Sequence, residues 1–130
     1  MRASTLLGMV LLLAGAVLIT VGWLGWRRRL PRNRFAGVRT PATLRSQAAF
    51  SAANRVAAAP IGAAGVVCAA GGALALRAQG AELAVITGIT GAGAVGLVLA
   101  AGLLGHRVAV AMAAPSPGRC AGCTRHGQLP

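Results

Sequence analysis

The sequence predicts an all-α integral membrane protein with three transmembrane helices and one short helix in a cytoplasmic loop. The chain has 130 residues, of which 56% are hydrophobic and 11% are charged, so it lacks the polar surface of a soluble domain. Three apolar segments, at about residues 4–26, 57–76 and 83–105, are long enough to cross a hydrocarbon core of ~30 Å. Alanine and glycine dominate these segments, which suits helices that pack through small side chains in lipid.

The first segment has the ends of a membrane span. Between Ser4 and Trp26 there is no charged residue, and the arginines of residues 27–29 follow at once. Tryptophan at the membrane surface and arginine just beyond it are typical of the end of a transmembrane helix. A signal peptide has a more basic head and a shorter apolar region. We therefore predict that this segment spans the membrane and is not cleaved.

The arginine-rich loop, residues 27–56, carries eight of the thirteen arginines and no acidic residue. Thr40 followed by Pro41 has the form of a helix start, because threonine caps helices well and proline fits the first helical position. We expect a short helix from Pro41 to about Ala59. Gly37 is expected to adopt a positive φ that other residues resist.

The second and third segments carry small residues at every fourth position. Such spacing lets helix backbones approach closely in lipid. We expect these residues to pack helices together within one subunit, with self-association into a homo-oligomer as the alternative. The short link between the two segments makes them antiparallel neighbours. The residues are Gly65, Ala69 and Ala73 in the second segment and Ala84, Gly88, Ala92, Gly96 and Ala100 in the third.

The distribution of charge predicts the orientation. The arginine-rich loop and the residues after the third span carry eleven arginines, against Arg2 and Arg77 on the other side. The positive-inside rule then places loop 27–56 and the C-terminus in the cytoplasm and the N-terminus outside. We predict a multi-pass protein of the cell (plasma) membrane, with a membrane domain at residues 1–107 and a disordered cytoplasmic tail at 108–130.

The composition leaves little for catalysis. With one carboxylate side chain, no lysine, no tyrosine and two histidines, paired acids, Schiff bases and carboxylate metal cages have no residues to use. We expect no enzymatic activity and no cofactor. Only Cys120, Cys123 and His126 resemble a metal site, and structural zinc takes four ligands where this tail offers three. A metal- or redox-responsive membrane protein that acts through this CxxC tail is one alternative function, and a solvated tail with two reduced thiols is the simpler interpretation.

The arginines of the loop need anionic partners from elsewhere, since neither the loop nor the tail contains an acid. The candidates are anionic lipid headgroups, the C-terminal carboxylate, backbone carbonyls at helix ends and an acidic partner protein. Nucleic acid is disfavoured, because Phe35 and Phe50 are isolated and single-strand binding relies on aromatic stacking platforms. A structural membrane component that the loop anchors to anionic lipid is therefore an alternative to a protein that binds a partner.

Between the first two spans the chain reads Asn-Arg, then Gly-Val-Arg-Thr, then Thr-Leu. This order resembles the signature loop of the SdpI family of bacterial membrane proteins, over about residues 20–80. Gln47, Phe50 and Asn54 stand where members commonly carry an acidic residue, a tryptophan and a histidine. The residues that match the family are Asn33, Arg34, Gly37, Arg39, Thr40, Thr43, Leu44 and Arg55.

The resemblance implies a protein that acts by binding. The family is named for an immunity protein that protects a toxin-producing bacterium from its own secreted toxin, and that protein is also implicated in holding a cytoplasmic repressor at the membrane. We therefore expect toxin immunity or membrane sequestration of a regulator, with a protein toxin or a cytoplasmic regulator as the partner. On this interpretation the anionic group or partner is bound by Asn33, Arg34, Arg39 and Arg55. The loop is shaped by Gly37, Thr40, Pro41, Thr43 and Leu44.

Overall fold

The computed structural model describes residues 3–27, 29, 40–41 and 43–113. The helices in this part are, in chain order, α1 (Ala3–Trp26), the short 3-10 helix η1 (Thr43–Arg45), α2 (Gln47–Ala75) and α3 (Gly80–Ala113). By length and composition, α1, α2 and α3 are each able to cross a membrane. The predicted all-α membrane fold with three spans is confirmed.

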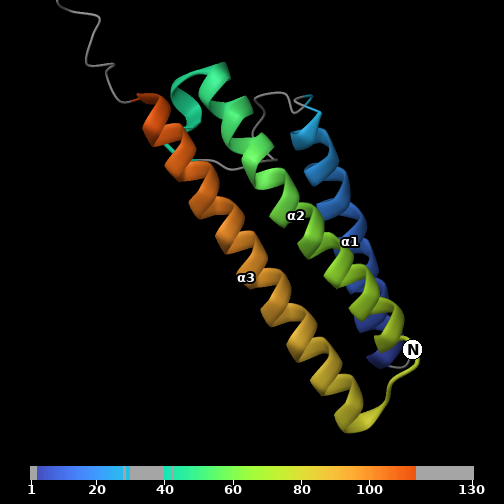
Figure 1. Ribbon diagram of the computed structural model, residues 1–130. Helices are drawn as coiled ribbons and strands as arrows, with labels where there is room; N and C mark the ends of the chain where they lie inside the picture. The colour runs from blue at the N-terminus through green and yellow to red at the C-terminus, as the bar shows by residue number, and fades with distance from the viewer. Residues whose placement is uncertain (1–2, 28, 30–39, 42, 114–130) are drawn as a thin grey trace, which may run out of the picture.

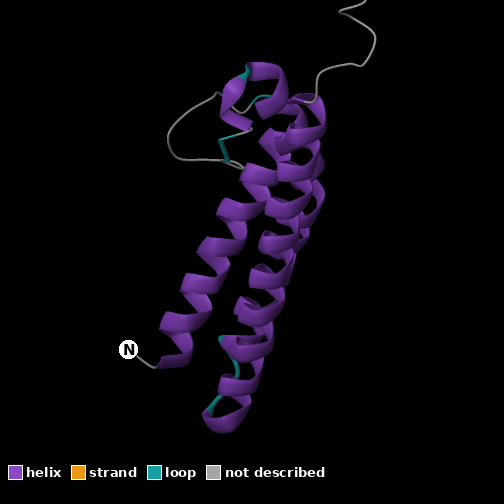
Figure 2. Cartoon of the chain, turned by 90° about the vertical axis from the view of Figure 1, so that its left-hand side faces the viewer, coloured by secondary structure: helices purple, strands orange, loops and turns teal. Residues whose placement is uncertain are grey.

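The helix α2 lies between the other two and contacts both of them extensively (Figure 1). The start of α1 and the connection from α2 to α3 lie at one end of the bundle. The start of α2 and the end of α3 lie at the other, as the view from the side also shows (Figures 1 and 2). Three antiparallel passes of this kind place the first and last helical residues at opposite ends.

The predicted loop helix is not a separate element in the described part of the chain. We expected a helix at residues 41–59 and then a span at 57–76, whereas α2 runs unbroken from Gln47 to Ala75. Ser46 caps its first turn, because the Ser46 hydroxyl accepts a hydrogen bond from a backbone N–H at 3.1 Å. The 29 residues of α2 extend roughly 44 Å at ~1.5 Å per residue, well beyond a hydrocarbon core of ~30 Å.

Pro60 lies in the interior of α2. A proline inside a helix removes one backbone hydrogen bond. Membrane helices tolerate this loss where neighbouring helices hold them in place. Ala57 and Ile61, on either side of Pro60, are buried together with Ala101 of α3. The helix α2 is therefore packed against α3 at the level where Pro60 removes the hydrogen bond.

The helix α3 extends beyond the predicted span of 83–105 at both ends. Residues 108–113, which we assigned to a disordered tail, are helical, and the rest of the tail lies outside the described residues. At the other end the chain turns from α2 into α3 through Gly80, whose φ is +56°. Glycine adopts this left-handed conformation without steric cost, so the turn needs only residues 76–79 between the two helices.

Helices α1 and α2 meet through glycine. Gly8, Gly15 and Gly22 recur at every seventh residue of α1, and all three are buried. A Cβ atom added at Gly15 would lie 2.8 Å from backbone atoms of both Gly65 and Ala69 of α2. The two backbones are therefore in contact. A repeat of seven keeps the same face of a helix against its neighbour over several turns, as in a left-handed coiled coil.

The small residues of α3 do not pack as predicted. Its buried side chains are those of Thr90, Ala94, Ala101 and Ala109. The predicted stripe lies on a different face: Ala84, Gly88, Ala92 and Gly96 are exposed, and Ala100 is half-buried. On the packed face of α3, the Thr90 side chain fills the space that Gly71 of α2 leaves open. The exposed stripe therefore makes no close contact within the described subunit.

Candidate functional site

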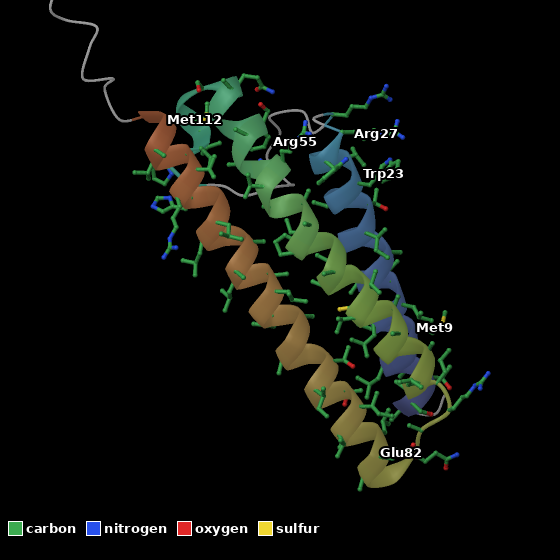
Figure 3. The ribbon with its side chains drawn as sticks, viewed as in Figure 1. Met9, Trp23, Arg27, Arg55, Glu82 and Met112 are labelled. Atoms are coloured by element: carbon green, nitrogen blue, oxygen red, sulfur yellow. The ribbon has the colours of Figure 1, made fainter. Side chains whose placement is uncertain are left out.

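One end of the bundle is cationic. Arg27 at the end of α1 and Arg55 near the start of α2 lie together at this end, and Glu82 lies at the other (Figure 3). Glu82 is the only acidic residue in the chain. No carboxylate side chain is therefore available near Arg27 and Arg55, and their charges must be balanced by groups from outside the helical bundle.

Thr40 and Thr43, two of the predicted loop-shaping residues, bond to each other. The Thr40 N–H donates to Thr43 Oγ1 at 2.8 Å, and the Thr43 N–H donates to Thr40 Oγ1 at 3.3 Å. The Thr43 hydroxyl in turn donates to the Thr40 carbonyl at 2.9 Å. Pro41 lies exposed in the turn between them. This reciprocal pattern resembles a capping box, in which two residues three apart satisfy each other's backbone donors, and it fixes the start of η1.

The helix η1 packs against both α2 and α3. Thr43 and Phe50 are fully buried and are the largest such side chains in the described part of the chain. Asn54, one turn after Phe50, is also buried, and its Nδ2 donates to the Phe50 carbonyl at 2.8 Å. The C-terminal end of the arginine-rich loop is thus attached firmly to the bundle through buried side chains.

Two arginines lie over tryptophan rings at the same end. The Arg27 guanidinium is 4.5 Å from the centre of the Trp23 ring, and the Arg55 guanidinium is 5.5 Å from the centre of the Trp26 ring. Both distances are within the ~6 Å over which a cation is attracted to an aromatic face. Neither guanidinium makes a hydrogen bond or ion pair in the described region. Their N–H groups are therefore available to an anion.

Of the four predicted binding residues, the structure describes only Arg55. Asn33, Arg34 and Arg39 lie outside the described residues, as does the loop-shaping Gly37. Arg55 is described and exposed, at the boundary between α1 and α2. The remaining loop-shaping residues, which η1 brings together, are Thr40, Pro41, Thr43 and Leu44. The grouping of these residues into one binding site stays a prediction.

The candidate metal ligands Cys120, Cys123 and His126 also lie outside the described residues. In the ranges that the structure does describe, His, Cys, Asp and Glu side chains form no group of three that could hold a metal ion. Cys68 is buried beside Ala64 and Ala94 at the contact between α2 and α3. It acts there as a small apolar residue.

Neither arginine–tryptophan contact was predicted from the sequence. Trp23 and Arg27 are four residues apart, which puts them on one side of a continuous helix, so this contact had a signal in the sequence. Arg55 and Trp26 belong to different helices and meet only because α1 packs closely on α2. The cap at Ser46 was also missed, although a serine before a run of helix-forming residues is a common start signal.

Comparison with known proteins identifies the family. The model of the SdpI/YfhL protein family matches residues 29–112. The match reaches beyond the residues 20–80 on which the resemblance rested, because it includes nearly all of α3, and it begins after α1. No curated protein and no solved structure matches the chain. Since the match spans well over half of the 130 residues and contains η1 and Arg55, the chain belongs to the SdpI/YfhL protein family.

Proposed function

We propose that this multi-pass membrane protein acts by binding and not by catalysis, as an immunity-type protein or as one that holds a regulator at the membrane. The observation that supports this proposal is its membership of the SdpI/YfhL family over residues 29–112. That segment contains most of the arginine-rich loop, all of α2 and nearly all of α3. The proposed partner is a protein toxin or a cytoplasmic regulator.

In the proposed orientation, loop 27–56 and the C-terminus face the cytoplasm and the N-terminus lies outside. The positive-inside rule supports this orientation, since the loop holds eight of the thirteen arginines. The end of the bundle with Arg27 and Arg55 is then the cytoplasmic end, and the end with Glu82 is the outer one. A cytoplasmic regulator would have direct access to the loop.

The proposed binding surface consists of Asn33, Arg34, Arg39 and Arg55. A guanidinium offers two parallel N–H donors that match a carboxylate or a phosphate. The loop contains no acid that would compete for these donors. The bonds between Thr40 and Thr43 fix the start of η1, which packs against α2 and α3 and so attaches this part of the loop to the bundle. An attachment of this kind lowers the conformational entropy that the loop loses when a partner binds.

The test uses the toxin and the repressor of the system after which the family is named. Toxin-sensitive cells that produce this chain are challenged with the toxin, and a fluorescent repressor fusion reports recruitment to the membrane. We expect the wild-type chain to give protection or recruitment and Arg39→Ala to abolish it. Arg77→Ala is the matched control, because Arg77 is exposed at the other end of α2. The amount of each variant in the membrane fraction is measured in parallel.

Two results would contradict the proposal. The first is an inserted wild-type chain that gives neither protection nor recruitment. The second is an Arg39→Ala variant that performs as well as the wild type. The Arg77→Ala control shows whether the loss of any arginine has the same effect.

A structural role as a lipid-anchored membrane component is the second candidate. It is favoured by the position of Arg27 and Arg55 beside Trp23 and Trp26, since tryptophan is enriched at the membrane surface. The variant Arg39→Lys separates the two functions. A lipid anchor needs only the positive charge and should tolerate lysine, whereas bidentate recognition of a partner should not.

A further inference from the structure

A groove runs along the boundary between α1 and α2, near the end of the bundle that carries Arg27 and Arg55. Its volume is about 330 Å³, at the lower end of the range of ~300–1,000 Å³ found for ligand pockets. Nearly all of its lining is apolar, and it is open on one side. Trp23 and Trp26 of α1 and Gly62 of α2 are among the residues that form it.

The groove forms where Gly22 of α1 and Gly62 of α2 meet beside the larger side chains of Trp23 and Trp26. A Cβ atom added at Gly22 would lie 3.0 Å from the backbone nitrogen of Gly62, so the two backbones touch at this level. A Cβ atom at Gly62 itself would meet nothing within 4 Å, because it would point into the groove. The residues Trp23 and Trp26 are 58% and 56% exposed and line this gap.

The length of the groove along α1 fits within one leaflet of a membrane. On α1 it extends from Trp26 to Ile19, which is roughly 10 Å at ~1.5 Å per residue. Half of a hydrocarbon core of ~30 Å is ~15 Å. Since the tryptophans mark the membrane surface, the groove begins at the level of the headgroups and lies among the acyl chains of one leaflet.

Two arginines lie at the end of the groove that is nearest the membrane surface. Arg27 lies over Trp23 and Arg55 lies over Trp26, so both guanidinium groups are held on residues that line the groove. The single acid of the chain, Glu82, is at the opposite end of the bundle (Figure 3). A ligand that matches both features has an apolar chain and an anionic head. Phospholipids with a net negative charge have this structure.

We propose that the groove between α1 and α2 binds one acyl chain of an anionic phospholipid, while Arg27 and Arg55 bind its headgroup phosphate. The site shares Arg55 with the proposed partner-binding surface. It does not involve Asn33, Arg34 or Arg39 and does not depend on them. It explains why two arginines are held at the edge of an apolar groove that the protein's own side chains leave unfilled.

The experiment is photo-crosslinking on the full-length chain in phosphatidylcholine vesicles that contain a small fraction of phosphatidylglycerol with a photoreactive acyl chain. We expect the adducts to concentrate at residues 19–26 and 58–66 and to be sparse on the exposed face of α3. The same reactive chain on phosphatidylcholine should label the groove several-fold less. Equal labelling by the two lipids, or adducts spread evenly over α3, would each overturn the proposal.

Two variants and two matched controls test the residues. Gly62→Leu fills the groove and should lose the adducts. Arg27→Gln should lower labelling roughly fivefold, which is the effect of one basic residue near an anionic surface. The controls are Gly88→Leu, which adds the same side chain where a Cβ meets no atom within 4 Å, and Arg77→Gln at the other end of α2. Both controls should label like the wild type. Helical content by circular dichroism is measured for all four variants.

Unchanged labelling in Gly62→Leu would overturn the groove as the site, and unchanged labelling in Arg27→Gln would overturn the role of the charge. The outcome is also distinguishable from a failure of the proposed function. Arg39→Ala should lose protection or recruitment while it keeps the lipid adducts. Gly62→Leu should lose the adducts while it keeps protection or recruitment.

Discussion

Replacement of Gly15 by alanine tests the close packing of α1 on α2. The added Cβ would lie 2.8 Å from the nitrogen of Ala69 and from the carbonyl oxygen of Gly65. Both are backbone atoms, so no change of a side-chain rotamer relieves the contact. Ordinary contacts of a Cβ atom begin at 3.4 Å, which means that the two helices must separate locally by about half an ångström.

The magnitude follows from a matched pair of variants. Gly88→Ala makes the same chemical change inside α3, at an exposed position where a Cβ meets no atom within 4 Å. The gain in helix propensity, up to ~1 kcal/mol, is common to both variants and cancels in the comparison. What remains is the cost of overpacking at Gly15, typically about 1–3 kcal/mol. We therefore expect Gly15→Ala to be less stable than Gly88→Ala by about 1–3 kcal/mol.

The assay is reversible unfolding in mixed micelles of mild detergent and dodecyl sulfate, followed by circular dichroism. The free energy of unfolding is compared between the two variants and the wild type. If Gly15→Ala proves as stable as Gly88→Ala, the backbones of α1 and α2 are not in contact at this level and the reasoning is refuted.

Three further predictions concern the turn, the cap and the loop. Gly80→Ala should lower the free energy of unfolding by about 1–2 kcal/mol relative to Gly88→Ala, because only glycine adopts a φ of +56° freely, and equal stabilities would contradict this. Thr43→Val removes a fully buried hydroxyl that bonds the Thr40 backbone, and should destabilise η1 by about 1–3 kcal/mol, read as faster amide hydrogen exchange. Thr20→Val is its control, because the exposed Thr20 hydroxyl only bonds a carbonyl of its own helix, and equal exchange at η1 in both variants would refute the prediction. Arg39→Lys should lose partner binding if recognition is bidentate, measured by protection or recruitment, and full retention would favour the lipid anchor.

The number of spans could be predicted because it depends on hydropathy and length, and the end of α1 could be predicted because tryptophans and arginines mark it. Lipid offers no hydrogen bonds to the backbone, so a long apolar segment must be helical there. The start of α2 and the end of α3 could not be predicted in this way. Residues such as Phe50 and Ala109 lie beyond the most apolar part of their helices, and they are fully buried by tertiary contacts that a hydropathy pattern does not contain.

The faces through which the helices pack could not be predicted from residue size alone. Small residues occur on several faces of α1, α2 and α3, so small size permits close packing without specifying it. The four-residue spacing correctly included Gly65, which contacts Gly15 of α1, but it selected an exposed face of α3. The contact on α1 repeats every seven residues, which is the period of two helices that wrap around each other. A search at that period would have found Gly8, Gly15 and Gly22.

The parts of the candidate site differ in how local their geometry is. Thr40 was expected as a helix cap and Thr43 was named only through the family resemblance, and the structure shows hydrogen bonds between the two residues. The contact of Arg55 with Trp26, and the groove beside it, depend on the register of α1 against α2. That register is set by contacts such as Gly22 against Gly62, which pair residues far apart in the sequence.

The sidedness of the arginine-rich loop is tested most directly by two glutamines at opposite ends of α2. Gln47 is its first residue and Gln79 follows its last turn, and both are exposed. Each is changed to cysteine in a chain whose own cysteines are replaced by alanine, and spheroplasts are treated with a membrane-impermeant maleimide. We predict that Gln79→Cys is labelled in intact spheroplasts and that Gln47→Cys is labelled only after the membrane is opened. Labelling of Gln47→Cys from outside, with Gln79→Cys protected, would contradict the proposed cytoplasmic position of the loop.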